Sequence, residues 1–228
     1  KTPALPTQIE GGLHIRQHEP PLQMEFRLYE HKLPAAIVFA RANGLNQIHL
    51  NPTRPKLGIV AAGKSWGDVM GALKVLGLDL KAAEDAGIRL LKIGMIWPLD
   101  SEILRDFVEG LECVLVVEEK RPFLEDQIKA MFYAAGLSGY VRVIGKMYPM
   151  GFGGDDEPGL LPMTGEMNPQ LIANAIGKLT DVKMPAVLNI ENVNLGPIRL
   201  PNFCSGCPHN SSTVVPEGSR SMAGIGCH

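Results

Sequence analysis

Residues 57–77, LGIVAAGKSWGDVMGALKVLG, form the segment that decides the fold. Its first six residues are an unbroken apolar run, which is typical of a strand buried on both faces. After this run, apolar residues recur at the spacing of one helical face: Trp66, Val69, Met70, Leu73 and Leu76. Ser65 stands where it could cap that helix. The segment therefore predicts a buried strand that leads directly into a helix.

The same pattern recurs along the chain. Further short apolar runs cover residues 88–93, 113–117 and 140–144, with stretches of helical period between and after them. Residues that favour helix starts precede these stretches: Asp100, Pro122 and the pair Asn168-Pro169. Strands that alternate with helices and are apolar enough to be covered on both faces indicate a parallel sheet between two helical layers. The predicted fold is a three-layer αβα domain with a mostly parallel sheet.

The flanking segments predict a division of the chain into three parts. Residues 1–55 form an irregular and partly helical lead-in from a preceding domain. Residues 56–182 form the α/β domain, in which residues 148–165 are rich in Gly, Pro and acidic side chains and are typical of an exposed loop. Residues 183–228 form a linker and the truncated start of another domain. We therefore expect the chain to be a piece of a longer polypeptide.

The lead-in contains one expected helix, over residues 24–42. Pro34 should kink this helix or start a second one, because proline lacks an amide hydrogen and its ring crowds the preceding turn. The pair Asn43-Gly44 is placed to close it in a left-handed conformation.

The composition excludes several classes of partner. Hydrophobic residues make up 45% and charged residues 20% of the sequence, which is the balance of an ordinary globular domain. The net charge of −2 gives no excess of basic side chains, so we expect no nucleic acid partner. No apolar run approaches the roughly 18 to 20 residues of a membrane helix, and no signal peptide core follows Lys1. We expect a cytoplasmic protein.

Residues 58–65, GIVAAGKS, match the phosphate-loop pattern G-x-x-x-x-G-K-[ST]. A phosphate-binding loop needs its intervening residues in a turn whose amides converge on the anion. Here the intervening Ile-Val-Ala-Ala belongs to the expected strand. A nucleotide-binding protein that uses Gly58 to Ser65 is therefore only an alternative hypothesis, although free amides at the start of the following helix could still hold an anion.

A charged stretch, Glu118-Glu119-Lys120-Arg121, follows the apolar run 113–117. Open parallel sheets usually place function at the carboxyl ends of their strands. No histidine or nucleophile accompanies these residues in the sequence, so we interpret the stretch as a contact with another domain and not as a catalytic group.

Three of the four cysteines lie close together in the sequence, Cys204 and Cys207 as a C-x-x-C pair and Cys227 after them. The fourth, Cys113, fits a small buried hydrophobic residue. A zinc site would need one more ligand, and His209 or His228 could complete a Cys3His set within a zinc-stabilised interaction module. An iron–sulfur cluster would need a fourth thiolate from elsewhere. The spacing alone leaves these two sites open, and a thioredoxin-like redox pair fits poorly because no strand precedes Cys204.

The segment FCSGCPH (203–209), followed by GIGCH (224–228), resembles the start of the thiamine-diphosphate-binding domain of 2-oxoacid:ferredoxin oxidoreductases. The version with Cys-Pro-His is most similar to indolepyruvate:ferredoxin oxidoreductase. Three earlier segments resemble the transketolase C-terminal-type domain of the same family: LGIVAAGKS (57–65), GMIWPL (94–99) and VVEEKR (116–121). Their order and spacing extend the resemblance through most of the chain.

The resemblance implies an enzyme that oxidatively decarboxylates an aryl 2-oxo acid to the acyl-CoA. Its implied cofactors are thiamine diphosphate with Mg²⁺ and a 4Fe-4S cluster that passes electrons to ferredoxin. Cys204, Cys207 and Cys227 would be cluster ligands, with a fourth from later in the domain. Ile225 and Gly226 would lie beside the thiamine diphosphate. The other partners would be coenzyme A, the remaining domains of the same polypeptide and further copies of the enzyme.

The family's Gly-Asp-Gly motif for magnesium diphosphate and its activating glutamate have no match in this sequence. We therefore expect no catalytic residue on this chain. We also expect that, by itself, it binds neither thiamine diphosphate nor a complete cluster and shows no turnover.

Overall fold

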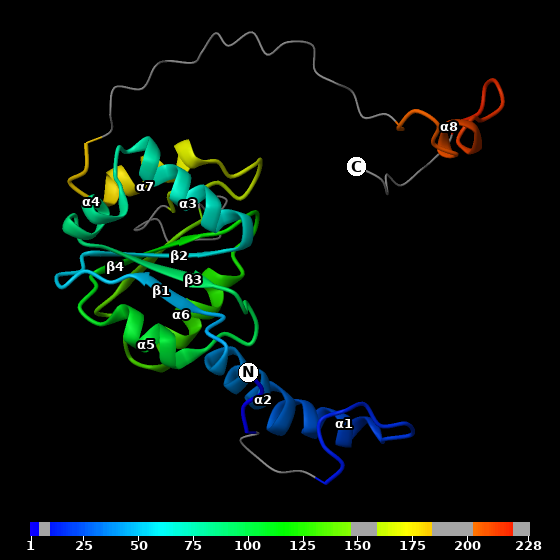
Figure 1. Ribbon diagram of the computed structural model, residues 1–228, viewed down its shortest axis with the longest axis horizontal. Coiled ribbons are helices and arrows are strands. Elements are labelled where there is room, and N and C mark those ends of the chain that lie inside the picture. The colour runs from blue at the N-terminus through cyan, green and yellow to red at the C-terminus, as the bar shows by residue number, and fades with distance from the viewer. Residues whose placement is uncertain (5–9, 147–158, 184–202, 221–228) are drawn as a thin grey trace. The chain divides into compact units, whose positions relative to one another are not determined.

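The computed structural model describes residues 1–4, 10–146, 159–183 and 203–220. The chain divides into two compact units, Lys1–Ala186 and Val187–His228. The first unit contains a five-stranded sheet with helices on both of its faces (Figure 1).

The strands are β1 (Gln47–Leu50), β2 (Leu57–Ala62), β3 (Ile88–Ile93), β4 (Cys113–Val117) and β5 (Arg142–Ile144), in the spatial order β1-β3-β2-β4-β5. β2 is central and runs parallel to β3 and β4, with Leu57 opposite Ile88 on one side and Cys113 on the other. β5 continues the parallel part beside β4. The predicted runs thus form strands, although the last one begins only at Arg142.

β1 was missing from the sequence prediction, which placed residues 47–50 in the irregular lead-in. This strand pairs antiparallel with β3 at the edge of the sheet. Its sequence, Gln-Ile-His-Leu, alternates polar and apolar residues because only one side of an edge strand needs to be buried here. Four alternating residues are too short to be recognised as a strand by their period.

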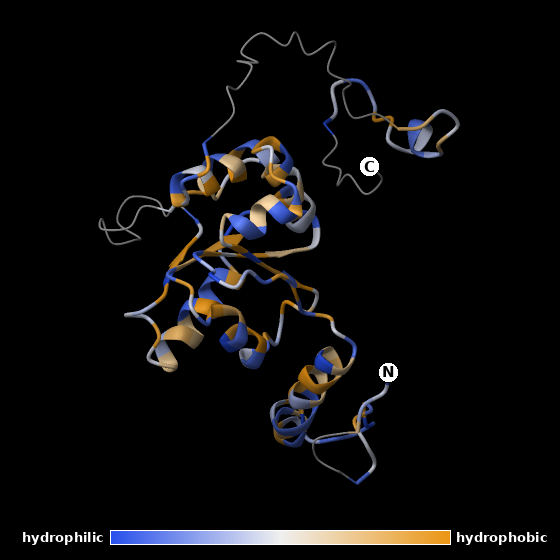
Figure 2. Cartoon of the chain, turned by 60° about the vertical axis from the view of Figure 1, so that its left-hand side comes forward, coloured by the Kyte–Doolittle hydropathy of each residue, from blue (hydrophilic) through white to orange (hydrophobic). Residues whose placement is uncertain are grey.

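Helices cover both faces of the sheet. One face carries α3 (Gly63–Val75), α4 (Leu80–Asp85) and α7 (Pro169–Leu179), and the other carries α5 (Ser101–Val108) and α6 (Leu124–Ala134). Side chains of β2 alternate between the two layers, since Leu57 and Ile59 pack with the first set and Val60 packs with the second. Figure 2 shows mainly apolar strands between helices that also carry hydrophilic residues. The predicted three-layer αβα fold is confirmed.

Two of the predicted helix starts are confirmed. Asp100 Oδ1 accepts a hydrogen bond from the Glu102 amide at 3.0 Å, and Asn168 Oδ1 accepts one from the Leu171 amide at 3.0 Å. Each side chain thereby satisfies an amide that has no partner within its helix.

The other two predicted helix starts were misplaced. α3 begins at Gly63, which has a φ of +52°, so Ser65 lies buried inside the first turn and does not cap the helix. Pro122 lies ahead of α6, which begins at Leu124. No local sequence pattern indicated that the free amides at the start of α6 would find an acceptor at the end of the preceding strand.

The N-terminal helices of the first unit are α1 (Pro21–Arg27), the π-helical turn η1 (Leu28–Lys32) and α2 (Leu33–Ala42). Pro34, the second residue of α2, explains the π turn because its ring crowds the carbonyl of residue 30. The widened turn is closed by a hydrogen bond from the Leu33 amide to the Leu28 carbonyl. Gly44, with a φ of +59°, follows the end of α2 as predicted.

The second unit is described over residues 203–220. It contains a tight turn at Cys204–Cys207 and the short helix α8 (His209–Ser212). In the parts of both units that the structure describes, no helix is long and apolar enough to cross a membrane.

Gly58 on β2 allows α5 to approach the sheet. A Cβ atom at this position would lie 2.5 Å from Leu111 Cδ1 and 2.7 Å from Phe107 Cζ, both of which belong to buried side chains. Gly58→Ala should therefore lower the free energy of unfolding by about 1–3 kcal/mol through overpacking. Urea denaturation of the chain would measure the change.

Gly67→Ala is the matched control. Gly67 lies inside α3, where an added Cβ would meet nothing within 4 Å. This substitution should raise the free energy of unfolding by about 0.5–1 kcal/mol, because alanine loses less conformational entropy than glycine in a helix. Equal urea midpoints for Gly58→Ala and the wild type would contradict the packing role of Gly58.

Candidate functional site

The carboxyl ends of β2 and β4 lie side by side, and the chain leaves them towards opposite faces of the sheet. β2 continues into α3 on one face, whereas β4 leads to α6 on the other. Open α/β sheets usually bind ligands at such a switch point. Here Lys64 follows β2, and Glu118 and Glu119 follow β4.

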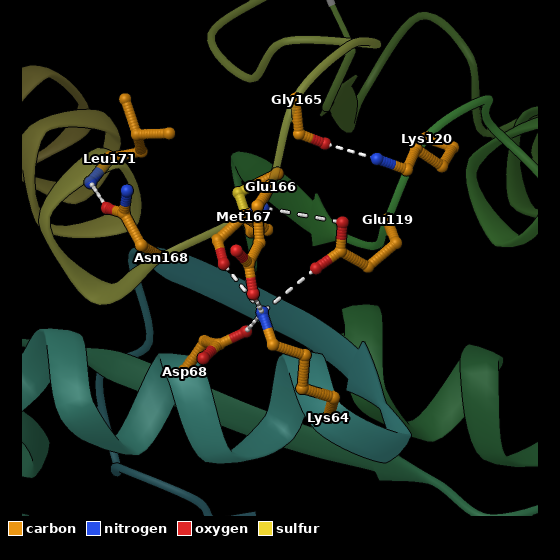
Figure 3. A network of polar contacts seen from close by, with 9 residues as sticks. All are labelled: Lys64, Asp68, Glu119, Lys120, Gly165, Glu166, Met167, Asn168 and Leu171. Carbon is orange, nitrogen blue, oxygen red and sulfur yellow. Dashed lines mark hydrogen bonds and ion pairs between the residues drawn. The ribbon is translucent and has the colours of Figure 1, made fainter. Parts of the chain in front are cut away.

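Lys64 is surrounded by oxygen acceptors (Figure 3). Its Nζ donates hydrogen bonds to Glu119 Oε1 at 3.0 Å and to the Met167 carbonyl at 2.6 Å. It also forms ion pairs with Asp68 Oδ2 at 3.1 Å and Glu166 Oε1 at 3.8 Å. The hydrogen bond with Glu119 raises the pKa of Lys64 and lowers the pKa of Glu119. We call these five residues the Lys64 network.

This arrangement does not support the phosphate-loop alternative. Residues 59–62 lie in β2 and pair with β3, so they form no loop around an anion. The absence of a side chain at Gly58 instead lets the α5 layer pack close to β2. The ammonium of Lys64 is already satisfied by protein oxygens.

The end of β4 binds a distant segment of the same unit. The Met167 amide donates to Glu119 Oε2 at 3.4 Å, and Lys120 Nζ donates to the Gly165 carbonyl. Lys120 adopts a φ of +55°, which is uncommon for a residue with a side chain. Glu119 and Lys120 thus contact the segment that leads into α7 (Figure 3), and their predicted contact with another domain stays a prediction.

Glu118 supplies the missing acceptor for α6. Its buried carboxylate accepts hydrogen bonds from the amides of Phe123 at 3.0 Å, Leu124 at 2.8 Å and Glu125 at 3.0 Å. A carboxylate at a helix N-terminus is also favoured by the helix dipole. Glu118 therefore fixes the angle at which the chain turns from β4 into α6, a role that no local sequence pattern indicated.

A second buried charge lies after β5. Lys146 is 1% exposed, and its Nζ donates to the Pro162 carbonyl at 3.0 Å. Burial lowers its pKa, although the carboxylates of Glu118, Glu119 and Glu125 oppose this effect. Glu125 is fully buried and accepts the Lys146 amide at 2.8 Å. Sequence reasoning missed both residues, and the only signal was a lysine two residues after the end of β5.

The charged groups at the carboxyl edge of the sheet are therefore satisfied by backbone groups and by one another. They hold the starts of α3, α6 and α7 in position, and among the described residues of this edge we assign none to catalysis.

The C-x-x-C pair forms a tight turn in the second unit. The Cys207 amide donates to the Cys204 carbonyl at 3.0 Å, and Gly206 adopts a φ of +79° between them. Asn210 Nδ2 donates to the same Cys204 carbonyl at 3.0 Å. Within the described residues neither thiol forms a disulfide, and Cys204 is exposed whereas Cys207 is half-buried. A turn that presents two thiols fits either zinc or an iron–sulfur cluster, since both prefer thiolate ligands.

The remaining predicted site residues lie outside the described residues. They are Cys227, Ile225, Gly226 and His228. Within residues 1–4, 10–146, 159–183 and 203–220, no group of three His, Cys, Asp or Glu side chains could hold a metal ion. The described turn thus supplies two of the predicted ligands, and the contribution of Cys227 stays a prediction.

His209 lies beside this turn. Its Nδ1 is 3.2 Å from Cys207 Sγ, and its ring stacks on Phe203 with 5.2 Å between the ring centroids and an interplanar angle of 25°. The structure thus brings one of the two candidate zinc-ligand histidines next to a thiol.

Residues 47–192 match the family model of the indolepyruvate oxidoreductase domain. The match starts at β1 and covers more than half of the chain. The chain is 32% identical over 186 residues to the indolepyruvate oxidoreductase subunit IorA of Methanothermobacter marburgensis, with 82% of the chain and 26% of the relative covered. It is 31% identical over 169 residues to the same subunit of Pyrococcus abyssi, with 71% and 22% covered. The chain spans about a quarter of the length of these curated relatives.

Two solved structures are also similar to the chain. One is a 2-oxoglutarate:ferredoxin oxidoreductase from Magnetococcus marinus with 2-oxoglutarate, coenzyme A and succinyl-CoA bound, with a TM-score of 0.42, 16% identity, and coverage of 70% of this chain and 23% of that one. The other is a split gene transketolase described as an inactive beta4 tetramer, with a TM-score of 0.40, 19% identity, and coverage of 61% and 42%. Neither likeness carries a functional argument at these scores. The match to the family model over more than half of the sequence establishes that the chain belongs to the indolepyruvate oxidoreductase family.

Proposed function

We propose that the chain is part of an enzyme that oxidatively decarboxylates an aryl 2-oxo acid of the indolepyruvate type to its acyl-CoA. Ferredoxin would accept the electrons, and coenzyme A would accept the acyl group. The observation that carries the proposal is the family match over residues 47–192. The names of the curated relatives, subunits of indolepyruvate oxidoreductase, support the choice of substrate class.

The cofactors of the proposed enzyme are thiamine diphosphate with Mg²⁺ and a 4Fe-4S cluster. When bound, they would supply the carbanion stabilisation for decarboxylation and the acceptor for single electrons. On this chain, Cys204 and Cys207 would hold the cluster together with Cys227, while Ile225 and Gly226 would contact the thiamine diphosphate. The thiols and tight turn of the described C-x-x-C pair support the first of these assignments.

The proposal gives each part of the chain a place in the larger enzyme. Residues 1–55 would lead in from a preceding domain, residues 56–182 would form the α/β domain, and residues 183–228 would form a linker and the start of the thiamine-diphosphate domain. The partners of the chain would then be other domains of the same polypeptide and further copies of the enzyme in the cytoplasm.

The α/β domain would serve this enzyme as a rigid support. The Lys64 network connects the start of α3, the end of β4 and the segment before α7 through hydrogen bonds and ion pairs. Because these charges are satisfied within the unit, the reacting groups of the enzyme would come from other parts of the polypeptide.

Cysteine substitutions test the cluster assignment. In the full-length enzyme purified without oxygen, Cys204→Ser and Cys207→Ser should each remove the iron and acid-labile sulfide of one cluster and the paramagnetic signal of its reduced form. The reason is that serine replaces a thiolate ligand by a weakly acidic hydroxyl. Iron and sulfide analysis with electron paramagnetic resonance would measure the loss.

Cys113→Ala is the control, because Cys113 is buried in β4 and should leave the iron content unchanged. One tightly held zinc per chain in the full-length enzyme, with no cluster that depends on Cys204 or Cys207, would contradict the assignment and favour the zinc-stabilised module.

Replacing Lys64 tests the structural role of its network. Lys64→Met should lower the urea midpoint at pH 7, since it leaves Glu119 without its cation. The folded-state pKa of Glu119 is lowered, so its contribution is present above the ordinary carboxylate pKa and is lost as the pH falls through the folded value. The difference between Lys64→Met and the wild type should therefore shrink below about pH 4.

Lys81→Met provides the comparison, because Lys81 on α4 forms only exposed pairs with Glu84 and Asp85. Such surface pairs contribute little to stability. Equal effects of the two substitutions at pH 7 would argue against a special role for the Lys64 network. Nucleotide binding that disappears in Lys64→Met would instead restore the phosphate-loop hypothesis.

A further inference from the structure

We propose that His209 is a positioning residue for the cluster, donating a hydrogen bond from Nδ1 to the sulfur of Cys207 and thereby raising the reduction potential of the cluster. This inference rests on the proposed function, because it takes Cys207 to be a cluster ligand. It adds a role for a side chain outside the predicted set of thiolate ligands.

The contact between the two side chains is direct. His209 Nδ1 lies 3.2 Å from Cys207 Sγ, which is a hydrogen-bond distance for a sulfur acceptor. A cysteine bound to a metal is a thiolate, which has no hydrogen to donate. In the loaded site, His209 must therefore carry the hydrogen on Nδ1 for this contact to be a hydrogen bond.

Several constraints hold the imidazole in this orientation. Its ring stacks on Phe203, the residue directly before Cys204, with 5.2 Å between centroids. Pro208 separates His209 from Cys207 and restricts the backbone between them, at a φ of −56°. The His209 carbonyl accepts the Thr213 amide at 3.1 Å. The ring thus lies between an aromatic side chain and a thiol of the same turn.

The C-x-x-C turn has its own hydrogen bonds, which do not involve the imidazole. The Cys207 amide and Asn210 Nδ2 both donate to the Cys204 carbonyl, each at 3.0 Å. Removing the imidazole should therefore leave the spacing of the two thiols intact. This separation makes it possible to test the hydrogen bond without removing the ligands.

A hydrogen bond to a cluster thiolate stabilises the more negative, reduced state of the cluster. Loss of this bond should therefore weaken reduction. For a one-electron couple, a tenfold fall in the equilibrium constant for reduction corresponds to a potential about 59 mV lower. We expect a fall of about threefold to tenfold. A hydrogen bond to a charged group is worth roughly tenfold or more in total, and only the part that differs between the oxidised and reduced cluster changes the potential.

The competing role for His209 is that of a metal ligand, as in a Cys3His zinc site. The two roles differ in what survives the loss of the imidazole. Removing a metal ligand should release bound metal, whereas removing a hydrogen-bond donor should leave the cluster in place with an altered reduction potential.

The experiment compares His209→Ala and His209→Gln in the full-length enzyme, purified without oxygen. The readouts are iron content and the midpoint potential of the cluster, measured by redox titration followed with electron paramagnetic resonance. His209→Ala should keep its iron and titrate at a lower potential. His209→Gln should recover part of the difference, because glutamine keeps a side-chain N–H donor.

His49→Ala is the matched control. His49 also packs against an aromatic ring, that of Trp66 at 4.8 Å, but belongs to the sheet of the first unit. Its loss should leave the potential unchanged.

Full iron with an unchanged potential in His209→Ala would overturn the proposal, and so would a loss of iron in both His209 variants. A wild-type enzyme without a cluster that depends on Cys204 and Cys207 would refute the proposed function itself, and the two failures are therefore distinguishable.

Discussion

The burial of β2 on both faces is the constraint on which the first unit depends. Leu57, Ile59 and Val60 are at most 1% exposed, so the strand is stable only with a helical layer on each side. On one of these sides Gly58 allows a short distance between β2 and α5, because side chains of the α5 layer occupy the space where its own side chain would be. The order of strands around β2 then determines where the connections to α3 and α6 diverge. The charged residues therefore lie at the carboxyl ends of β2 and β4, where the chain turns towards the helices that cover β2.

At that edge, the cost of removing charges from water determines what the residues can do. Buried ions are stable only when paired and hydrogen-bonded. Glu118 meets this condition through three amides of α6, and Glu125 through the Lys146 amide and Lys129 Nζ. A carboxylate whose oxygens already accept hydrogen bonds from the protein holds chain segments in place. Such a carboxylate is poorly suited to bind a reacting substrate. The carboxyl edge, where many α/β sheets bind ligands, thus stabilises the fold of this domain.

The sequence predicts the parts of the fold that depend on local periodicity. β2 and β4 were found because every residue in them is apolar or glycine, and β3 was found because apolar residues outnumber Arg89 and Lys92. β1 and α4 were missed because short elements at the edge of a sheet or on its surface carry too few periodic residues. The roles of Glu118 and Lys146 depend on partners that are distant or that belong to the next element, so their charges alone gave no indication. The match of GIVAAGKS to a phosphate loop was kept only as an alternative, and the structure does not support it: residues 59–62 lie in β2, and Gly58 has a steric role that depends on Phe107, far along the chain.

The C-x-x-C turn is formed by residues that lie close together in the sequence. In the described part of the second unit, Gly206, Asn210 and the backbone hold the turn that presents the two thiols. Ordering a loop costs conformational entropy, and a site that is partly ordered before binding requires less of the metal's binding energy for folding. The third ligand proposed on this chain, Cys227, lies outside the described residues. A local motif can therefore predict the kind of ligand, whereas the number of ligands that meet at one centre is a property of the whole folded enzyme.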